Sequence, residues 1–207
     1  MKDQIIKKLQ TLTSEEKQGL FLNFMVYGYN MVSIKGESFQ ADELEILRSF
    51  IEAGVHVNQK NSAGAAPLIF VHTKSKSKEM AKLLIQAGAD VNTKNKYGNT
   101  PLFYAPSKEL VELLIQHGAD VNAINNQQNT PLHLESKSEI IELLIQAGAD
   151  LSAKNEDGYP PAEFHRQNDD SDLADFIEQK AIEFEQKKLN QTLPNAPKNL
   201  NKTKLHL

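Results

Sequence analysis

The stretch LLIQAGADVN occupies residues 83–92, and close copies of it recur along the chain. LLIQHGADVN lies at residues 113–122 and LLIQAGADLS at residues 143–152, while a looser copy, SFIEAGVHVN, lies at residues 49–58. The intervals between successive copies are 34, 30 and 30 residues. Self-similarity at such intervals indicates that one structural unit is repeated along the chain.

A second pattern repeats in step with the first. GAAPL at residues 64–68, GNTPL at 98–102, QNTPL at 128–132 and GYPPA at 158–162 are separated by the same three intervals. Two patterns that keep one spacing over four copies are not a coincidence, so the repeat decides the fold class.

Each repeat predicts a pair of helices joined by a cap and a turn. Leu110, Leu113 and Leu114 follow the spacing of one apolar helix face. Gly118 ends this helix, where a left-handed residue without a Cβ atom is favoured. Thr100-Pro101 begins another helix, with threonine as the N-cap and proline in the first turn. Hairpin-like turns are expected near residues 58–66, 92–100, 122–130 and 152–160.

The residues that start and end these units resemble those of the ankyrin-repeat family. Thr130-Pro131-Leu132-His133 matches the family's helix-start tetrapeptide, and Gly88-Ala89-Asp90-Val91-Asn92 matches its repeat end. The resemblance covers roughly residues 36–180, and the chain is similar to the small ankyrin-repeat proteins of bacteria. It implies an all-α solenoid of stacked antiparallel helix pairs.

Three features depart from the family's pattern. The family period is about 33 residues, so the two 30-residue spacings predict a shortened first helix, of about one turn, in the units that begin at Thr100 and Thr130. The unit that begins at Ala66 is longer, which predicts an enlarged loop between its helices over residues 73–78. The lysine run over residues 74–82 is expected to be solvated or, as the alternative, to contact an acidic partner. Gln128 replaces a turn glycine, so an altered turn is expected.

The chain divides into three parts. Residues 1–35 are expected to form an N-terminal helical cap, with an apolar helix over residues 14–32 and a loop over residues 35–41. A docking helix for a partner is the alternative for this segment. Residues 36–189 form a repeat domain of four to five units, and residues 190–207, rich in asparagine, lysine and proline, are expected to be a disordered basic tail.

The charge distribution argues against some classes of partner. The net charge of −4 divides into +2 over residues 1–35, −10 over residues 36–178 and +4 over residues 179–207. Nucleic-acid binding needs a basic surface, so the acidic centre argues against it. The sequence has neither an apolar run of membrane-span length nor a signal-peptide core, so we expect a cytoplasmic protein, with non-classical export into a host cell left open.

No residue pattern predicts catalysis or a cofactor. The chain has no cysteine, and its histidines do not fall at metal-ligand spacing. These histidines are His56, His72, His117, His133, His165 and His206. The run from Asp169 to Asp172 lacks the glycine and the distal glutamate of a calcium loop and is expected at a helix N-terminus. We therefore expect no catalytic, cofactor-binding or metal-binding residues.

The resemblance implies that partners meet the turn tips and the first helices, which line the concave face. The positions that carry over are Ser62, Ala63, Ala65, Lys96, Tyr97, Asn99, Tyr104, Asn126, Gln127, Asn129, Glu135, Glu156, Asp157 and Tyr159. Tyr97 and Tyr159 are the expected anchors, because tyrosine offers a large apolar area with a polar tip. For Asn126, Gln127 and Asn129, a role as plain turn formers is an equal alternative.

Together these observations predict a monomeric protein–protein interaction scaffold whose partner protein is not identified by the sequence. Two settings are open: a bacterial effector that engages a host protein, with the basic tail as its export signal, or a resident cytosolic regulator or immunity-type inhibitor. An enzyme or metal-dependent protein carried on the scaffold is disfavoured, since no segment outside the repeats is large enough for a catalytic domain.

Overall fold

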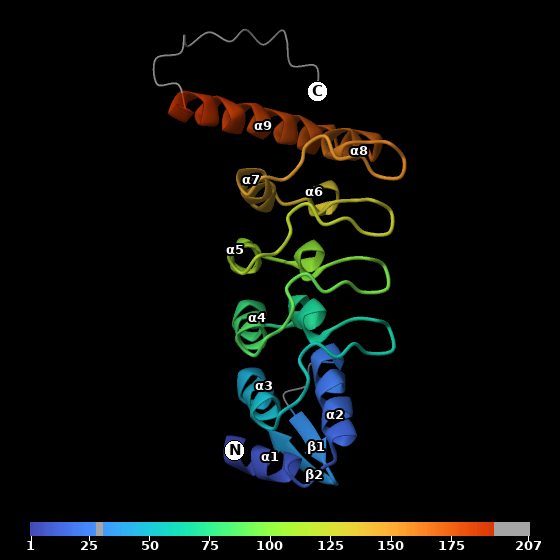
Figure 1. Cartoon of the computed structure of the whole chain (residues 1–207), viewed down its shortest axis with the longest axis vertical. Helices are drawn as coiled ribbons and strands as arrows, with labels where there is room; N and C mark the ends of the chain where they lie inside the picture. The colour runs from blue at the N-terminus through green and yellow to red at the C-terminus, as the bar shows by residue number, and fades with distance from the viewer. Residues whose placement is uncertain (28–30, 193–207) are drawn as a thin grey trace. The chain divides into compact units, whose positions relative to one another are not determined.

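The structure is a computed structural model that describes residues 1–27 and 31–192 (Figure 1). The chain divides into two compact units. One unit comprises Met1–Asp120, and the other begins at Val121. The last helix ends at Thr192. The disordered tail expected over residues 190–207 therefore lies, from residue 193 onward, outside the described residues.

The N-terminal part of the first unit contains three helices and a hairpin. They are α1 (Lys2–Leu9), α2 (Ser14–Tyr27), β1 (Met31–Ile34), β2 (Glu37–Gln40) and α3 (Glu43–Glu52). The expectation of one helix over residues 14–32 is wrong from residue 31 onward, and the loop expected over residues 35–41 is largely a strand. Residues 28–30 of the expected helix lie outside the described part.

The alternation of exposed and buried residues along β1 explains the β1–β2 hairpin. Val32 and Ile34 are buried while Ser33 is exposed, which is the period of two of a strand with one covered face. Lys35 and Gly36 have φ values of 48° and 80°. Positive φ at both central residues is what a two-residue hairpin turn requires. The alternation spans only four residues next to a longer apolar stretch, so it does not stand out in the sequence.

The two N-terminal helices cover the apolar side of α3. In α2, the rings of Phe21 and Phe24 lie 5.6 and 5.8 Å from the ring of Phe50 in α3. α1, which was not predicted as a separate helix, packs against α3 (Figure 1). It buries Ile5 and Leu9. A terminal element of this kind is needed because the first repeat of an array has an apolar face without a neighbouring repeat.

Each following repeat pairs a short first helix with a longer second one. The first unit contains the 3₁₀ helix η1 (Pro67–Thr73) with α4 (Ser77–Gln86), and the 3₁₀ helix η2 (Pro101–Tyr104) with α5 (Lys108–Gln116). The second unit contains α6 (Pro131–Leu134) with α7 (Ser138–Gln146), and α8 (Pro161–Gln167) with α9 (Ser171–Thr192). η2 and α6 have four residues each, which confirms the prediction of a one-turn first helix in the two 30-residue repeats.

The extra residues of the 34-residue repeat lengthen its first helix rather than its loop. η1 has seven residues, and residues 74–76 alone separate it from α4. Lys74 is only 7% exposed, its Nζ donates to the carbonyl of Phe24 at 3.4 Å, and burial lowers its pKa. Lys76 pairs with Asp42. The expectation of an enlarged loop is therefore wrong. Lys74, expected to be solvated, is buried against the N-terminal part of the same unit, whereas Lys76 is exposed.

The apolar faces of the second helices form the core of the first unit. Leu110 and Leu114 of α5 are buried, as their spacing predicts, and Met80 and Leu84 are buried on the neighbouring α4. The two helices contact each other. Neither helix could bury its apolar face alone, so the stability of one repeat depends on the next.

We expect Leu114→Ala to lower the free energy of unfolding by about 2–5 kcal/mol, because it removes buried methyl groups and leaves a cavity. Gln116→Ala, at an exposed position of the same helix, is the matched control and should cost less than about 0.5 kcal/mol. Urea unfolding followed by far-ultraviolet circular dichroism measures both variants. Equal costs for the two would contradict the burial of this helix face.

Candidate binding surface

One asparagine side chain organises the turn at the start of each repeat. Asn95 Oδ1 accepts hydrogen bonds from the backbone N–H groups of Tyr97 at 2.9 Å and Asn99 at 3.1 Å. The same bonds, to the residues two and four positions later, are made at 3.0–3.1 Å by Asn61, Asn125 and Asn155. Because the side chain replaces a backbone turn contact, each tip is held in a defined conformation.

Gln128 stands where the other three turns have glycine. Its φ is 58°, compared with 70°, 80° and 82° at Gly64, Gly98 and Gly158. Its N–H donates to the carbonyl of Asn125 at 3.0 Å, as the glycines do in their own turns. The altered turn expected here is therefore not found. Glutamine instead adopts the left-handed conformation of the glycine, which costs a residue with a Cβ atom about 1–2 kcal/mol.

Gln128→Gly is expected to raise the free energy of unfolding by about 0.5–1 kcal/mol, since the relief of backbone strain exceeds the larger entropy that glycine loses on folding. Gln127→Gly is the control, because Gln127 has no positive φ, and it should lower the same free energy by up to about 1 kcal/mol. Urea unfolding compares the two variants. A loss of stability in Gln128→Gly would refute the strain assigned to this turn.

A second set of asparagines links neighbouring repeats within each unit. In the first unit, Asn58 Nδ2 donates to the carbonyl of Gly88 at 2.8 Å, and Asn58 Oδ1 accepts from the N–H of Asp90 at 2.8 Å. The equivalent bonds join Asn92 to Gly118 and Asp120 at 2.9 and 2.8 Å, and, in the second unit, Asn122 to Gly148 and Asp150 at 3.1 and 2.7 Å. This role was not predicted, although the regular spacing of these asparagines was a usable signal.

In the first unit, the predicted contact residues differ in accessibility. Tyr97 is 58% exposed, and Lys96 Nζ lies 4.9 Å from the centre of its ring. Asn99 and Tyr104 are half-buried, and Asn99 Nδ2 donates to the Tyr104 hydroxyl at 2.8 Å. The Tyr104 ring also stacks on His72, with ring centres 5.0 Å apart. Tyr97 is thus open to a partner, while Asn99 and Tyr104 join the turn to the first helix.

The preceding turn of the first unit contributes little side-chain surface. Ser62 and Ala63 are exposed, and Ala65 is buried. Small side chains at the tip leave the backbone of this turn as its main accessible part.

In the second unit, most of the predicted contact residues are exposed. The exposed ones are Asn126, Gln127, Glu156, Asp157 and Tyr159. Asn129 is buried, and its Oδ1 accepts from Asn155 Nδ2 at 3.1 Å, so its side chain joins two turns of the unit. Glu135 is half-buried after the single turn of α6. The tips of this unit therefore offer amide and carboxylate groups beside one tyrosine.

His133 is fully buried in the second unit, with both ring nitrogens paired. Its Nδ1 accepts from the backbone N–H of Thr130 at 3.1 Å, so the proton lies on Nε2, which donates to the carbonyl of Tyr159 at 3.1 Å. The Thr130 hydroxyl lies 2.8 Å from the same Nδ1. Burial is the main cause that lowers the pKa of His133, and His165 nearby adds to it. Burial also lowers the pKa of His165.

The stability of the second unit should therefore depend on pH. The unfolded chain takes up protons at these two histidines near their usual pKa of about 6.5, whereas the folded chain does so only at lower pH. Stability is then fully present above about pH 7.5 and falls as the pH drops below 6.5, by up to about 1.4 kcal/mol per pH unit for each histidine.

His133→Gln should show a shallower fall in stability between about pH 7.5 and 5 than the wild type, because it removes one of the two proton-binding sites. His117→Gln, at an exposed histidine, should keep the full slope. Urea unfolding at a series of pH values measures the slopes. Identical slopes in the wild type and His133→Gln would rule out a neutral, buried imidazole at this position.

The repeat that begins at Thr100 lacks this imidazole. Phe103 occupies the register position of His133, and the hydroxyl of Thr100 is buried without a hydrogen-bond partner. Within the described residues, the other buried side-chain nitrogen or oxygen atom without a hydrogen-bond partner is Asn99 Oδ1. The threonine, proline and leucine of the helix start are thus kept in this repeat, while the polar pairing they make around His133 is lost.

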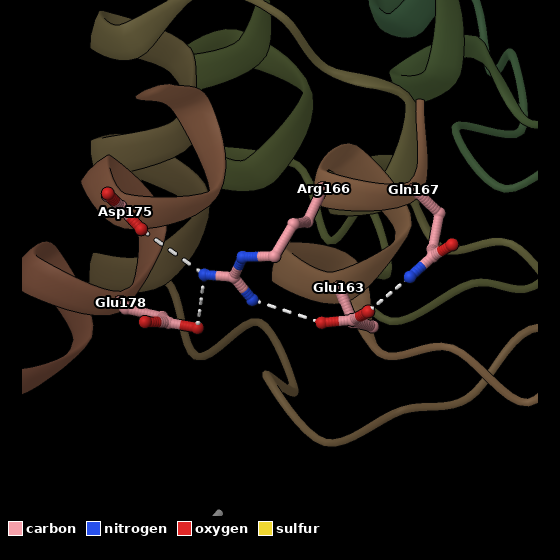
Figure 2. Close-up of polar contacts among 5 residues, drawn as sticks. All are labelled: Glu163, Arg166, Gln167, Asp175 and Glu178. Atoms are coloured by element: carbon pink, nitrogen blue, oxygen red, sulfur yellow. Dashed lines mark hydrogen bonds and ion pairs between the residues drawn. The ribbon is translucent and has the colours of Figure 1, made fainter. Parts of the chain in front are cut away.

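An arginine cluster joins α8 to α9 in the second unit (Figure 2). Arg166 donates to Glu163 at 3.0 Å, to Asp175 at 3.2 Å and to Glu178 at 3.1 Å. Gln167 Nε2 donates to Glu163, and this bond, followed by that from Arg166, lowers the pKa of the Glu163 carboxyl. All five side chains have partners within the cluster, so its evident role is to hold the two helices together.

The run from Asp169 to Asp172 lies at the N-terminus of α9, as expected. Asp170 Oδ1 accepts from the backbone N–H of Leu173 at 3.1 Å. In the part of the chain that the structure describes, no three histidine, aspartate or glutamate side chains gather closely enough to hold a metal ion. No helix among residues 1–27 and 31–192 is both long and apolar enough to cross a membrane.

The paired helices, the left-handed glycines and the asparagine turns define an all-α repeat solenoid. A family model described as "Ankyrin repeats (3 copies)" matches residues 37–124 and residues 77–155, and the chain therefore belongs to the ankyrin-repeat family. A comparison with curated proteins gave no match. Ankyrin repeats are in general protein–protein interaction modules, and proteins built from them are typically non-enzymatic scaffolds.

Proposed function

We propose that this chain is a monomeric scaffold that binds a partner protein through its turn tips and first helices. The observation that carries the proposal is the exposure of Tyr97 and Tyr159 on turns whose backbone is held by Asn95 and Asn155. A tyrosine on a preformed turn buries a large area with little loss of conformational entropy. Exposed amide and carboxylate groups beside Tyr159 add hydrogen-bonding capacity without a catalytic arrangement.

The proposal is tested by isolating a partner with the full chain and then measuring its affinity for tip variants. Tyr97→Ala and Tyr159→Ala should each weaken binding by about 30-fold if they are hot spots, equivalent to about 2 kcal/mol. Gln116→Ala, exposed on α5 away from the turns, should leave the affinity unchanged. Deletion of residues 193–207 should also leave it unchanged. Full affinity in the double tyrosine variant, with none after the deletion, would overturn the proposal.

The setting of this interaction forms a further part of the proposal. The partner is met in a cytosol, either that of the producing cell, where the chain acts as a regulator or inhibitor, or that of a host cell, which it enters as an effector. The basic composition of the last residues, with Lys198, Lys202 and Lys204, supports an export signal. A reporter fused to residues 190–207 decides between the two: transfer into host cells indicates an effector, and retention indicates a resident regulator.

A further inference from the structure

Three apolar side chains of the second unit belong to residues that adjoin the buried His133 through the chain, a backbone hydrogen bond or a ring contact. Leu134 at the end of α6 is 44% exposed, and Tyr159 at the end of the following turn is 36% exposed. The backbone carbonyl of Tyr159 accepts from His133 Nε2, and the half-buried ring of Phe164 in α8 meets the His133 ring edge-on at 5.9 Å. We call Leu134, Tyr159 and Phe164 the apolar patch.

The repeat register places the members of the apolar patch on equivalent positions of neighbouring helices. Leu134 and Phe164 are 30 residues apart and each lies four residues after the N-cap of its helix, Thr130 and Pro160. α6 and α8 contact each other directly. The two side chains therefore lie at equivalent positions of adjacent first helices, and the ring of His133 contacts that of Phe164.

Three carboxylates lie close in sequence to members of the apolar patch. Glu135 follows Leu134 directly, and Glu156 and Asp157 lie at the tip that leads to Tyr159. Within the described residues, the side chains of Glu156 and Asp157 make no hydrogen bond or ion pair, and Lys154 is the single cation of that turn. Glu135 accepts hydrogen bonds from the backbone N–H groups of the two residues that follow it.

The second unit up to residue 189 carries a charge of the same sign. Residues 121–189 contain fourteen acidic and six basic side chains, a formal charge of −8, whereas residues 1–120 contain thirteen acidic and fourteen basic ones. Arg166, the one arginine of the second unit, is already bound by Glu163, Asp175 and Glu178. Near the apolar patch the three carboxylates outnumber the two cations that lie close to them in sequence, Lys137 and Lys154, so the local charge is negative.

We infer that the apolar patch binds a segment of a partner protein that carries an apolar side chain flanked by lysine or arginine. This inference rests on the proposed function and adds the chemistry of the partner to it. Contact with Leu134, Tyr159 and Phe164 removes apolar area from water and provides affinity. Glu135, Glu156 and Asp157 attract the flanking cations, speed association and disfavour acidic segments.

Three fluorescent peptides of equal length provide the probes, measured by anisotropy with the full chain. The first has lysine and arginine around a central Leu-Phe pair, the second has glutamate in place of every lysine and arginine, and the third has Gly-Ser in place of Leu-Phe. The first peptide alone should bind measurably, and its affinity should fall as salt is raised because exposed charges are screened. Equal binding of the first and second peptides, or no binding of the first, overturns the inference.

Substitutions in and outside the apolar patch test whether the first peptide binds there. Leu134→Ala and the pair Glu156→Gln with Asp157→Asn should each weaken binding of the first peptide by about tenfold, the size of a good single contact. Ile182→Ala, an exposed apolar residue on α9, and the pair Asp172→Asn with Glu185→Gln are the matched controls and should bind as the wild type does. Loss in the controls equal to that in the patch variants overturns the inference, since binding would then follow overall charge or apolarity.

Two outcomes distinguish a failure of the proposed function from a failure of the inference about the apolar patch. If the isolated partner protein loses affinity in Tyr97→Ala but binds Leu134→Ala as it binds the wild type, the scaffold function stands and the assignment of the apolar patch falls. If the first peptide binds the patch, and the partner protein loses affinity in Leu134→Ala but not in Tyr97→Ala, the patch assignment stands and the proposed use of the turn tip at Tyr97 falls.

Discussion

The hydrogen bonds of one asparagine per repeat set the spacing on which the other contacts depend. After the glycine that ends a second helix, the carbonyl of Gly88 and the N–H of Asp90 have no partner in their own helix, and both are bound by Asn58 of the preceding repeat. Asn92 and Asn122 do the same for the repeats that follow them within their units. Backbone groups must find a partner when they leave regular structure, so these bonds fix how far apart consecutive repeats lie.

Once that distance is set, the apolar faces of α4 and α5 meet and bury their leucines. Each asparagine contributes little energy by itself, because these groups are partly exposed, but it determines which contacts the larger apolar term can make.

Hydrogen bonds from single asparagines also explain how the chain can present the proposed recognition surface with few residues. Asn95 and Asn155 hold their turns through two backbone bonds each, so Tyr97 and Tyr159 begin from a nearly fixed position. A partner then meets a surface whose ordering entropy has already been lost on folding. Buried His133 serves the second unit in the same way, since it ties the start of α6 to the end of the next turn. The two tyrosines proposed to bind the partner therefore do not have to support the fold, which leaves them open to substitution.

The sequence predicted the parts of the fold that depend on residue types repeated in each unit. The apolar spacing of α5, the left-handed glycines and the one-turn first helices all follow from residue types whose effect is local, and the structure confirms them. The β1–β2 hairpin was missed because four residues of alternation are too few to compete with the apolar composition around them. The burial of Lys74 was missed because its partner, the carbonyl of Phe24, lies 50 residues away in sequence. Of the expected contact residues, Tyr97 and Tyr159 lie open, while Asn129 and Asn99 bond inside their units. No local pattern distinguishes an asparagine that faces a partner from one that completes a neighbouring turn.

The constant geometry of the asparagine links also bears on how the chain can change its length over evolution. Asn92 and Asn122 reach their partners 26 and 28 residues further on, while Asn58 reaches its partners 30 and 32 residues further on, and the four additional residues are taken up in and around the longer first helix η1. A gene duplication or deletion of whole 30-residue segments keeps every such link in step, since each copy carries both an asparagine and the groups that the preceding asparagine binds. The loss or gain of a single residue between them breaks a link unless a first helix can absorb it. Insertions are therefore tolerated at the first helices. The number of residues between the capping glycine of a second helix and the asparagine that follows it is the length least able to change.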